Sequence, residues 1–419
     1  MAAHGIRPRW GQPLTGIIAS AVFTLIALVL WWIFADPRGP FAKYEQPFLA
    51  FLAWMILVGV WQHILFGDWP FQKLPPLQRL IVETAVNVFM TWFIIYVILD
   101  KFLGKIMMPI WSITQMEHIT HKHAHILWES PVGAAITLIV LIGFFTFPFW
   151  TILFKKWPWG GQLSQPALGM AEWGWTAIIT ALAYGLLIFP FFALALKQTM
   201  LTGSIWWEGI AGTKSVNFII GVYEWMIVYL FMTANVWAGK PWDLVKKQPW
   251  SGFFGLISII ILSFITVKVL MAAMAAIYGP ADPTLKDGIM SLDYRYYHCA
   301  TIAGFTLFPF LAWNHYFDNW PQHMGVATGW IIRTIGVFVC AAIVGKIYYL
   351  VCEPVLGLPS QFVNNPVEFN GHHLNNKPLV WLFWWIIPML FFDWFAHKWP
   401  FYVEEKADHS AGHGTGVKA

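Results

Sequence analysis

Long apolar runs alternate with short polar stretches over almost the whole chain. There are ten such runs, at residues 14–35, 46–66, 79–103, 131–154, 172–197, 215–238, 252–277, 296–317, 325–352 and 378–397. A helix crosses the apolar core of a bilayer with about 20 residues, whereas the strands of a transmembrane barrel are shorter and alternate in polarity. The pattern therefore predicts an all-α integral membrane protein of about ten transmembrane helices. Residues 1–402 would form a single polytopic membrane domain, followed by a mobile polar C-terminal tail over residues 403–419.

Every second apolar run ends in a Trp-Pro pair or in a degenerate form of it. Four runs are followed by Trp-Pro, and Lys240-Pro241-Trp242 takes its place after the remaining one. The prolines follow one another at steps of 88, 83, 80 and 79 residues, at Pro70, Pro158, Pro241, Pro321 and Pro400. This spacing predicts five repeated two-helix hairpins, with all the turns on one membrane face. The alternative is simple anchoring, because Trp favours the membrane interface and Pro ends helices.

The composition agrees with a membrane protein. Of the 419 residues, 58% are hydrophobic, 18% are aromatic and only 11% are charged, against about 25% charged in soluble domains. Together with the net charge of +4, this excludes a soluble enzyme, a disordered protein and a nucleic-acid-binding protein. The lipid bilayer is the expected partner. The three cysteines form neither CxxC nor CxxCH, which excludes a c-type haem and a four-cysteine zinc site.

The orientation in the membrane is weakly encoded, because Lys and Arg are divided almost evenly between the two predicted faces. Basic residues near both ends of the chain, Arg7, Arg9, Lys398 and Lys406, favour cytoplasmic termini. We expect a bacterial inner-membrane protein with its Trp-Pro turns in the cytoplasm.

A dense histidine cluster precedes the fourth apolar run. Four of the 14 histidines fall within eight residues, flanked by two carboxylates, and the group comprises Glu117, His118, His121, His123, His125 and Glu129. A helix would place Glu117, His121, His125 and Glu129 on one face, and a strand would align His121, His123 and His125. Imidazole with carboxylate suits a transition metal such as Cu, Fe or Zn. The alternative is a wet interfacial loop whose histidines face water.

Five other histidines are candidate ligands. His298, His372 and His373 lie on the same predicted face as the cluster and could complete its metal site, although each alone is more typical of a structural role. Near the Trp-Pro turns, His63 and His315 occupy matching places in Trp61-Gln62-His63 and Trp313-Asn314-His315. Two helix histidines can bind haem b, so these two are candidate cofactor-binding residues. Hydrogen bonds from imidazole to turn carbonyls are the simpler interpretation.

Ionisable residues inside apolar segments are costly and are functional candidates by default. Glu224, Lys268 and Arg333 are such intramembrane charges. The predicted helices of Glu224 and Lys268 are neighbours in the sequence, so the two could form a buried pair. That pair would serve either transport or helix packing.

Three functions remain open from the sequence, and no catalytic residue can be named. The first is a metal-dependent or redox membrane protein, either an enzyme or the membrane subunit of an oxidoreductase complex, with its metal in the histidine cluster. The second is a polytopic transporter that uses Glu224, Lys268 and Arg333. The third is a structural subunit of a membrane assembly. Each is compatible with further membrane subunits or with a homo-oligomer.

Overall fold

The computed structural model describes most of the chain. The described residues are 6–36, 38–41, 46–103, 131–188, 208–212, 215–285, 288–321, 324–357, 367–369, 372–374 and 378–404. Most of them are helical, which confirms an all-α fold, and a helix lies in each of the ten predicted segments. The remaining regular structure is two small antiparallel sheets, in which β1 (Ile6–Pro8) pairs with β4 (Tyr402–Glu404) and β2 (Val367–Phe369) with β3 (His372–Leu374).

Five helical segments end at the Trp-Pro turns, and we call them the inner helices. They are α2 (Gln46–Val60) continued by the π-helix η1 (Trp61–Leu65), α6 (Pro131–Thr146) continued by α7 (Pro148–Phe154), α11 (Val216–Asn235), α13 (Leu292–His315) and α15 (Pro378–Trp394). Each inner helix packs against two others, in the order α2, α6, α11, α13, α15 and back to α2. The inner helices therefore form a closed ring.

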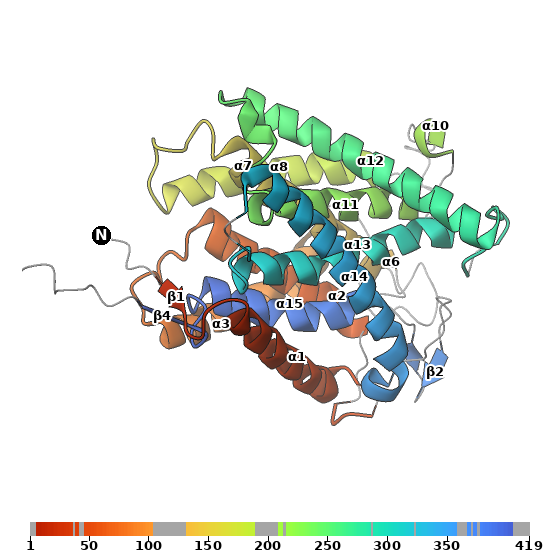
Figure 1. The fold of residues 1–419 in the computed structure, drawn as a ribbon, viewed down its shortest axis with the longest axis horizontal. Coiled ribbons are helices and arrows are strands. Elements are labelled where there is room, and N and C mark those ends of the chain that lie inside the picture. Colours follow the sequence, from red (N-terminus) through yellow and green to blue (C-terminus); the bar gives the residue numbers. More distant parts are fainter. Residues whose placement is uncertain are drawn as a thin grey trace, which may run out of the picture.

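Five outer helices cover this ring (Figure 1). They are α1 (Leu14–Phe34), α3 (Pro76–Trp92) continued by the π-helix η2 (Phe93–Leu103), α8 (Ala167–Leu187), α12 (Trp250–Tyr278) and α14 (Val326–Leu356). Each of the last four packs on the inner helix that precedes it, and α1 packs on α15, the last helix of the chain. The pairing of β1 with β4 joins the two ends of the chain in the same way. The five inner–outer pairs therefore follow one another around a circle.

The five turns share one backbone conformation. In each, the two residues before the Trp-Pro position have positive φ, between 49° and 81°, and the proline bond is cis. The second of these residues donates its backbone N–H to the carbonyl six residues earlier, as from Asp68 to Gln62 and from Lys398 to Phe392. Only one αL residue is usual at a helix end, so two in succession are uncommon outside glycine. The degenerate turn at Pro241 has this geometry as well, with Ala238 and Gly239 in the αL positions.

A Gln-Pro-x-x-Gly sequence begins three of the outer helices, at Gln12, Gln165 and Gln248. In each case the glutamine amide donates to the last carbonyls of a neighbouring inner helix, at Tyr316, Leu65 and Leu153 respectively. The glycine of each motif lies directly against the phenylalanine that follows that carbonyl. A Cβ on Gly169 would lie 2.6 Å from the Phe66 ring, and one on Gly252 would lie 2.5 Å from Phe154. The motif therefore locks an outer helix onto the inner helix of the preceding unit in the ring.

Polar side chains close the circle at the two remaining places. Arg79 of α3 takes the place of the glycine and donates to the Phe395 carbonyl at 2.6 Å, where the next inner-helix residue is the small Ala396. Asn319 in the turn after α13 donates to the Asn235 carbonyl at the end of α11. Each inner helix end is thus bonded to the neighbouring unit, and all five turns lie at the same end of the ring.

The outer helices carry large apolar residues on their exposed side, and two of them, α3 and α8, bury a row of polar side chains. On α3 the buried residues recur every four positions and are Arg79, Glu83, Asn87 and Thr91. On α12 the exposed side carries Ile257, Ile261, Ile265 and Val269, each at least half exposed. A surface helix of a soluble protein shows the opposite pattern. Among the described residues, five helices are long and apolar enough to cross a membrane, which is compatible with a membrane location: α1, Pro76–Leu99, α11, α12 and Ala327–Leu356.

Candidate functional site

The two histidines predicted to bind a cofactor, His63 and His315, lie at the same end of the ring, beside the Trp-Pro turns. His315 ends α13 and lines a cavity at the centre of the ring. The ring of His63 stacks on Trp394 of α15, with centroids 5.4 Å apart, and Trp394 lines the same cavity. The structure therefore places both histidines around one feature of the fold.

A carboxylate orients each of these histidines. The Nδ1 atom of His315 lies 2.6 Å from Oδ2 of Asp393, and the Nδ1 atom of His63 lies 2.9 Å from Oδ1 of Asp68. When Nδ1 carries the proton donated to a carboxylate, Nε2 becomes the basic nitrogen. Both imidazoles are thereby prepared to accept a proton or to bind an electrophile through Nε2.

Two cations stand behind the carboxylates. Lys398 lies 3.9 Å from Oδ1 of Asp393 and 3.6 Å from Oδ1 of Asp318, and its ammonium lies over the ring of Tyr402. Arg79 lies 3.8 Å from Oδ2 of Asp68. These cations stabilise the ionised carboxylates, which in turn keep the imidazoles oriented. We call the set of His63, Asp68, Arg79, His315, Asp393 and Lys398 the His–Asp network.

Polar groups from the chain ends border the network. Gln12 donates to Oδ2 of Asp318 at 2.8 Å and to the Tyr402 hydroxyl at 3.0 Å. The Tyr402 hydroxyl donates to the Tyr316 carbonyl. Burial raises the pKa of the Tyr402 phenol far above its usual range, and its hydrogen bond with Asp318 adds to this rise. Tyr402 therefore stays neutral as a hydrogen-bond donor next to the site.

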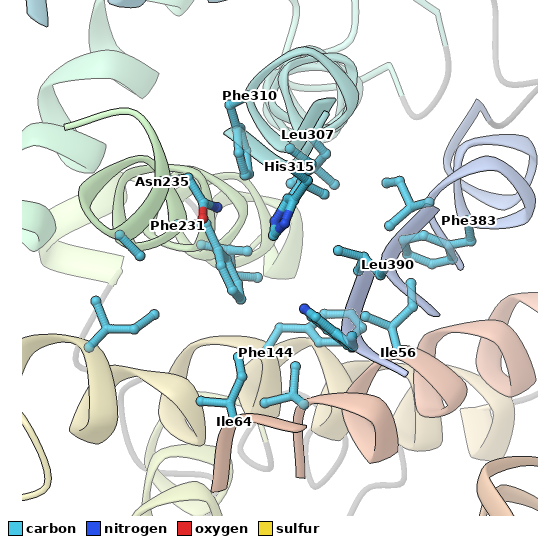
Figure 2. A pocket seen from close by; sticks show the side chains of 17 residues that line it. Ile56, Ile64, Phe144, Phe231, Asn235, Leu307, Phe310, His315, Phe383 and Leu390 are labelled. Atoms are coloured by element: carbon cyan, nitrogen blue, oxygen red, sulfur yellow. The ribbon is translucent and has the colours of Figure 1, made fainter. Parts of the chain in front are cut away.

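The cavity has a volume of about 150 Å³, and all five inner helices line it. Figure 2 shows the His315 imidazole pointing into this space from α13, with Phe231 and Asn235 of α11 beside it and Phe144 and Leu390 facing them. Almost all of the lining is hydrocarbon. The polar exceptions are His315, Asn235 and the Trp394 indole, so the cavity has one polar end, next to the His–Asp network.

The three predicted intramembrane charges do not form one site. Lys268 lies 5.4 Å above the ring of Phe264, and no ion pair joins it to Glu224 among the described residues. Arg333 donates to the Pro321 carbonyl at 3.2 Å, near a Trp-Pro turn. Glu224 is buried on α11 and precedes the cavity-lining Ile227 by three residues, which places it on the same helix face. Of the three, Glu224 alone is buried on an inner helix, but it is not among the residues that line the cavity.

The other predicted metal ligands that the structure describes, His298, His372 and His373, belong to the opposite end of the ring. His298 lies 17 residues before His315 on α13, about 25 Å away along the helix. It is buried and stacks on Tyr294. His372 and His373 are in β3, where His373 is paired with Glu368 of β2. The cluster itself, Glu117, His118, His121, His123, His125 and Glu129, lies outside the described residues. Within the described part of the chain, no group of three His, Cys, Asp or Glu side chains could hold a metal ion.

Several members of the site were not predicted from the sequence. Three of them lie in the turns, within two residues of Trp-Pro: Asp68, Asp318 and Lys398. The recurring Trp-Pro motif was the signal that could have found them. Asp393 was hidden in a strongly apolar run, six residues before Trp399. His63 precedes its turn by one residue more than His315 does, and the π-helix η1 accommodates that extra residue.

No known protein family, curated protein or solved structure matches this chain. The function must therefore be argued from the geometry of the site itself.

Proposed function

We propose that the chain is an integral membrane protein whose ten helices span the bilayer as five inner–outer pairs. The support is the inverted polarity of the outer helices, with Glu83, Asn87 and Thr91 turned inward and isoleucines turned outward on α12 and α14. Apolar surface of this extent would be unfavourable in water, whereas lipid accommodates it. The inner helices pack against one another and are covered by the outer helices.

Both described chain ends lie at the Trp-Pro end of the ring, since β1 pairs with β4 directly after the last turn. This supports the expectation that the two termini lie on the same side of the membrane. We assign this side as the cytoplasmic side of a bacterial inner membrane because of the basic residues near both ends of the chain, Arg7, Arg9, Lys398 and Lys406.

Within that membrane protein, we propose that the His–Asp network handles protons in a reaction on a molecule held in the central cavity. The observation that carries this proposal is the carboxylate contact at Nδ1 of His315, whose ring points into the cavity. A histidine whose Nδ1 is bound to a carboxylate is a competent general base through Nε2. His63, held in the same way by Asp68, would relay the proton toward the membrane surface.

Nitrogen NMR of histidine-labelled protein in lipid nanodiscs tests this assignment. We expect His315 to carry its proton on Nδ1 near neutral pH, and the signal is identified by its loss in His315→Gln. A proton on Nε2 instead would remove the base from the cavity and contradict the proposal.

The redox and metal interpretation stays a proposal for the other end of the ring. A metal site at residues 117–129, completed by His298, His372 and His373 as the sequence predicts, would make the protein a metal-dependent oxidoreductase or its membrane subunit. A haem between His63 and His315 fits poorly, because a porphyrin is several times larger than the 150 Å³ cavity beside them. Metal analysis and an optical spectrum of the purified protein decide this. Absence of Cu, Fe and Zn, with unchanged activity in His121→Ala/His125→Ala, would contradict the metal site.

Glu224 favours transport as a second candidate function. Its side chain is buried on the inner helix α11, and a buried carboxyl inside a membrane helix bundle is typical of proton and ion pathways. Proteoliposome flux that is lost in Glu224→Gln would support this function, and flux that persists in that variant would oppose it.

A further inference from the structure

The cavity at the centre of the inner ring has a feature that the His–Asp network does not explain, namely its size. Protein interiors are packed so closely that a void larger than a water molecule is uncommon. A space of about 150 Å³ on the axis, bounded by side chains from all five inner helices, is part of the architecture of the ring.

Water is a poor occupant of this space. A buried water needs two to four polar partners, and the polar atoms here are few. The Asn235 amide oxygen already accepts from Asn314 at 3.0 Å. Nδ1 of His315 is taken by Asp393, which leaves Nε2, the Asn235 amide nitrogen and the Trp394 indole, all at one end of the cavity, so water has no partner in the rest of the space. An ion is excluded for the same reason, because hydrocarbon lines the rest of the cavity.

Aromatic side chains surround the space. Four of the five inner helices each contribute a phenylalanine to the lining: Phe144, Phe231, Phe310 and Phe383. Phenyl rings pack favourably against flat or compact hydrocarbons. An apolar protein cavity of about 150 Å³ stays dry and binds benzene or xenon.

We propose that this cavity binds an uncharged apolar molecule about the size of benzene, with one end of the molecule against His315. The inference rests on the proposed function, because it names the class of substrate for the same site. The occupant is a compact hydrocarbon or a weakly polar derivative of one, because the apolar lining disfavours an ionised molecule.

Benzene is a direct probe for the purified full-length protein in nanodiscs. We expect a saturable rise of several degrees in the midpoint of thermal unfolding of the wild type. Ala234→Leu fills the cavity from α11. It should raise the benzene concentration needed for half-saturation at least tenfold. Ala181→Leu makes the same change on the exposed side of α8 and should respond like the wild type. If Ala234→Leu fails to fold, Ile56→Phe fills the cavity from α2 instead.

A response that rises linearly with benzene and is equal in all variants would mean partitioning into lipid, and would overturn the inference. The two proposals are separated in the wild type, because benzene binding and the position of the His315 proton are measured independently. If the wild type fails to bind benzene while His315 carries its proton on Nδ1, only the cavity inference is contradicted. Binding with a proton on Nε2 of His315 contradicts the proton-handling proposal alone.

Discussion

The imidazole of His315 and the carboxylate of Asp393 meet at 2.6 Å, although 78 residues separate them in the sequence. They end two adjacent inner helices, α13 and α15, and Lys398 faces the other carboxylate oxygen. Asp393→Asn removes the charge that both partners use, so we expect the free energy of unfolding to fall by about 2 kcal/mol. Denaturant unfolding of the detergent-solubilised protein measures this loss.

Asp243→Asn is the matched control, because Asp243 pairs with Lys240 at 2.8 Å on a partly exposed surface. Exposed pairs contribute less than about 1 kcal/mol. Equal effects of the two substitutions would contradict the importance given to the His–Asp network.

A second ion pair lies between an inner helix end and an outer helix. Lys156 lies 3.4 Å from Oε2 of Glu172, whose side chain is fully buried, and Thr151 donates to the other oxygen. Lys156→Met leaves this carboxylate without its cation, and we expect a loss of about 3 kcal/mol. Adding Glu172→Gln should restore most of the stability, because the uncompensated charge is then gone.

Lys155 provides the control for this pair. It has positive φ, as Lys156 has, but is exposed, so Lys155→Met should change stability by less than about 0.5 kcal/mol. If both substitutions cost the same, the backbone of the turn and not the buried pair would determine the effect. Thermal unfolding of the four proteins is sufficient to decide.

The Gln-Pro-x-x-Gly motif leads to a prediction within one helix. Gly169→Ala would place a methyl group 2.6 Å from the Phe66 ring, so we expect a loss of about 1–3 kcal/mol. Gly174→Ala in the same helix has no atom within 4 Å and should stabilise α8 by about 0.5–1 kcal/mol. Opposite signs in an unfolding titration are expected, and a neutral or stabilising Gly169→Ala would contradict the close contact.

The sequence was sufficient to predict the helical fold and the places of the ten helices, because each apolar run is long and its end is marked by proline or glycine. The binding of a cofactor by His63 and His315 stays a prediction, and counted from their turns the two positions differ by one residue. Asp393 could not be predicted, since its partner comes from a helix distant in the sequence and only the closed ring brings the two together. The cavity could not be predicted for the same reason: each lining residue looks like ordinary core. The Gln-Pro-x-x-Gly motif is visible in the sequence at Gln12, Gln165 and Gln248. Its role could not be predicted, because it consists of contacts with the inner helix of another unit.

The central claim is that the outer helices face lipid while the ring inside them is closed to it. Spin labels on α12 test this most directly, in a background where the three free cysteines, Cys299, Cys340 and Cys352, are replaced by alanine. Labels at Ile261 and Ile265 are on the exposed side, a label at Ile259 is fully buried, and one at Leu244 lies in the short helix η5 (Trp242–Leu244) after the Pro241 turn. Oxygen concentrates in the bilayer, whereas a charge-neutral nickel chelate stays in water.

In proteoliposomes, we predict frequent collisions with oxygen and few with the nickel chelate at Ile261 and Ile265. Leu244 should show the reverse, and Ile259 should be shielded from both. Nickel accessibility at Ile261 and Ile265 equal to that at Leu244 would contradict the account, because the apolar outer face would then be in contact with water.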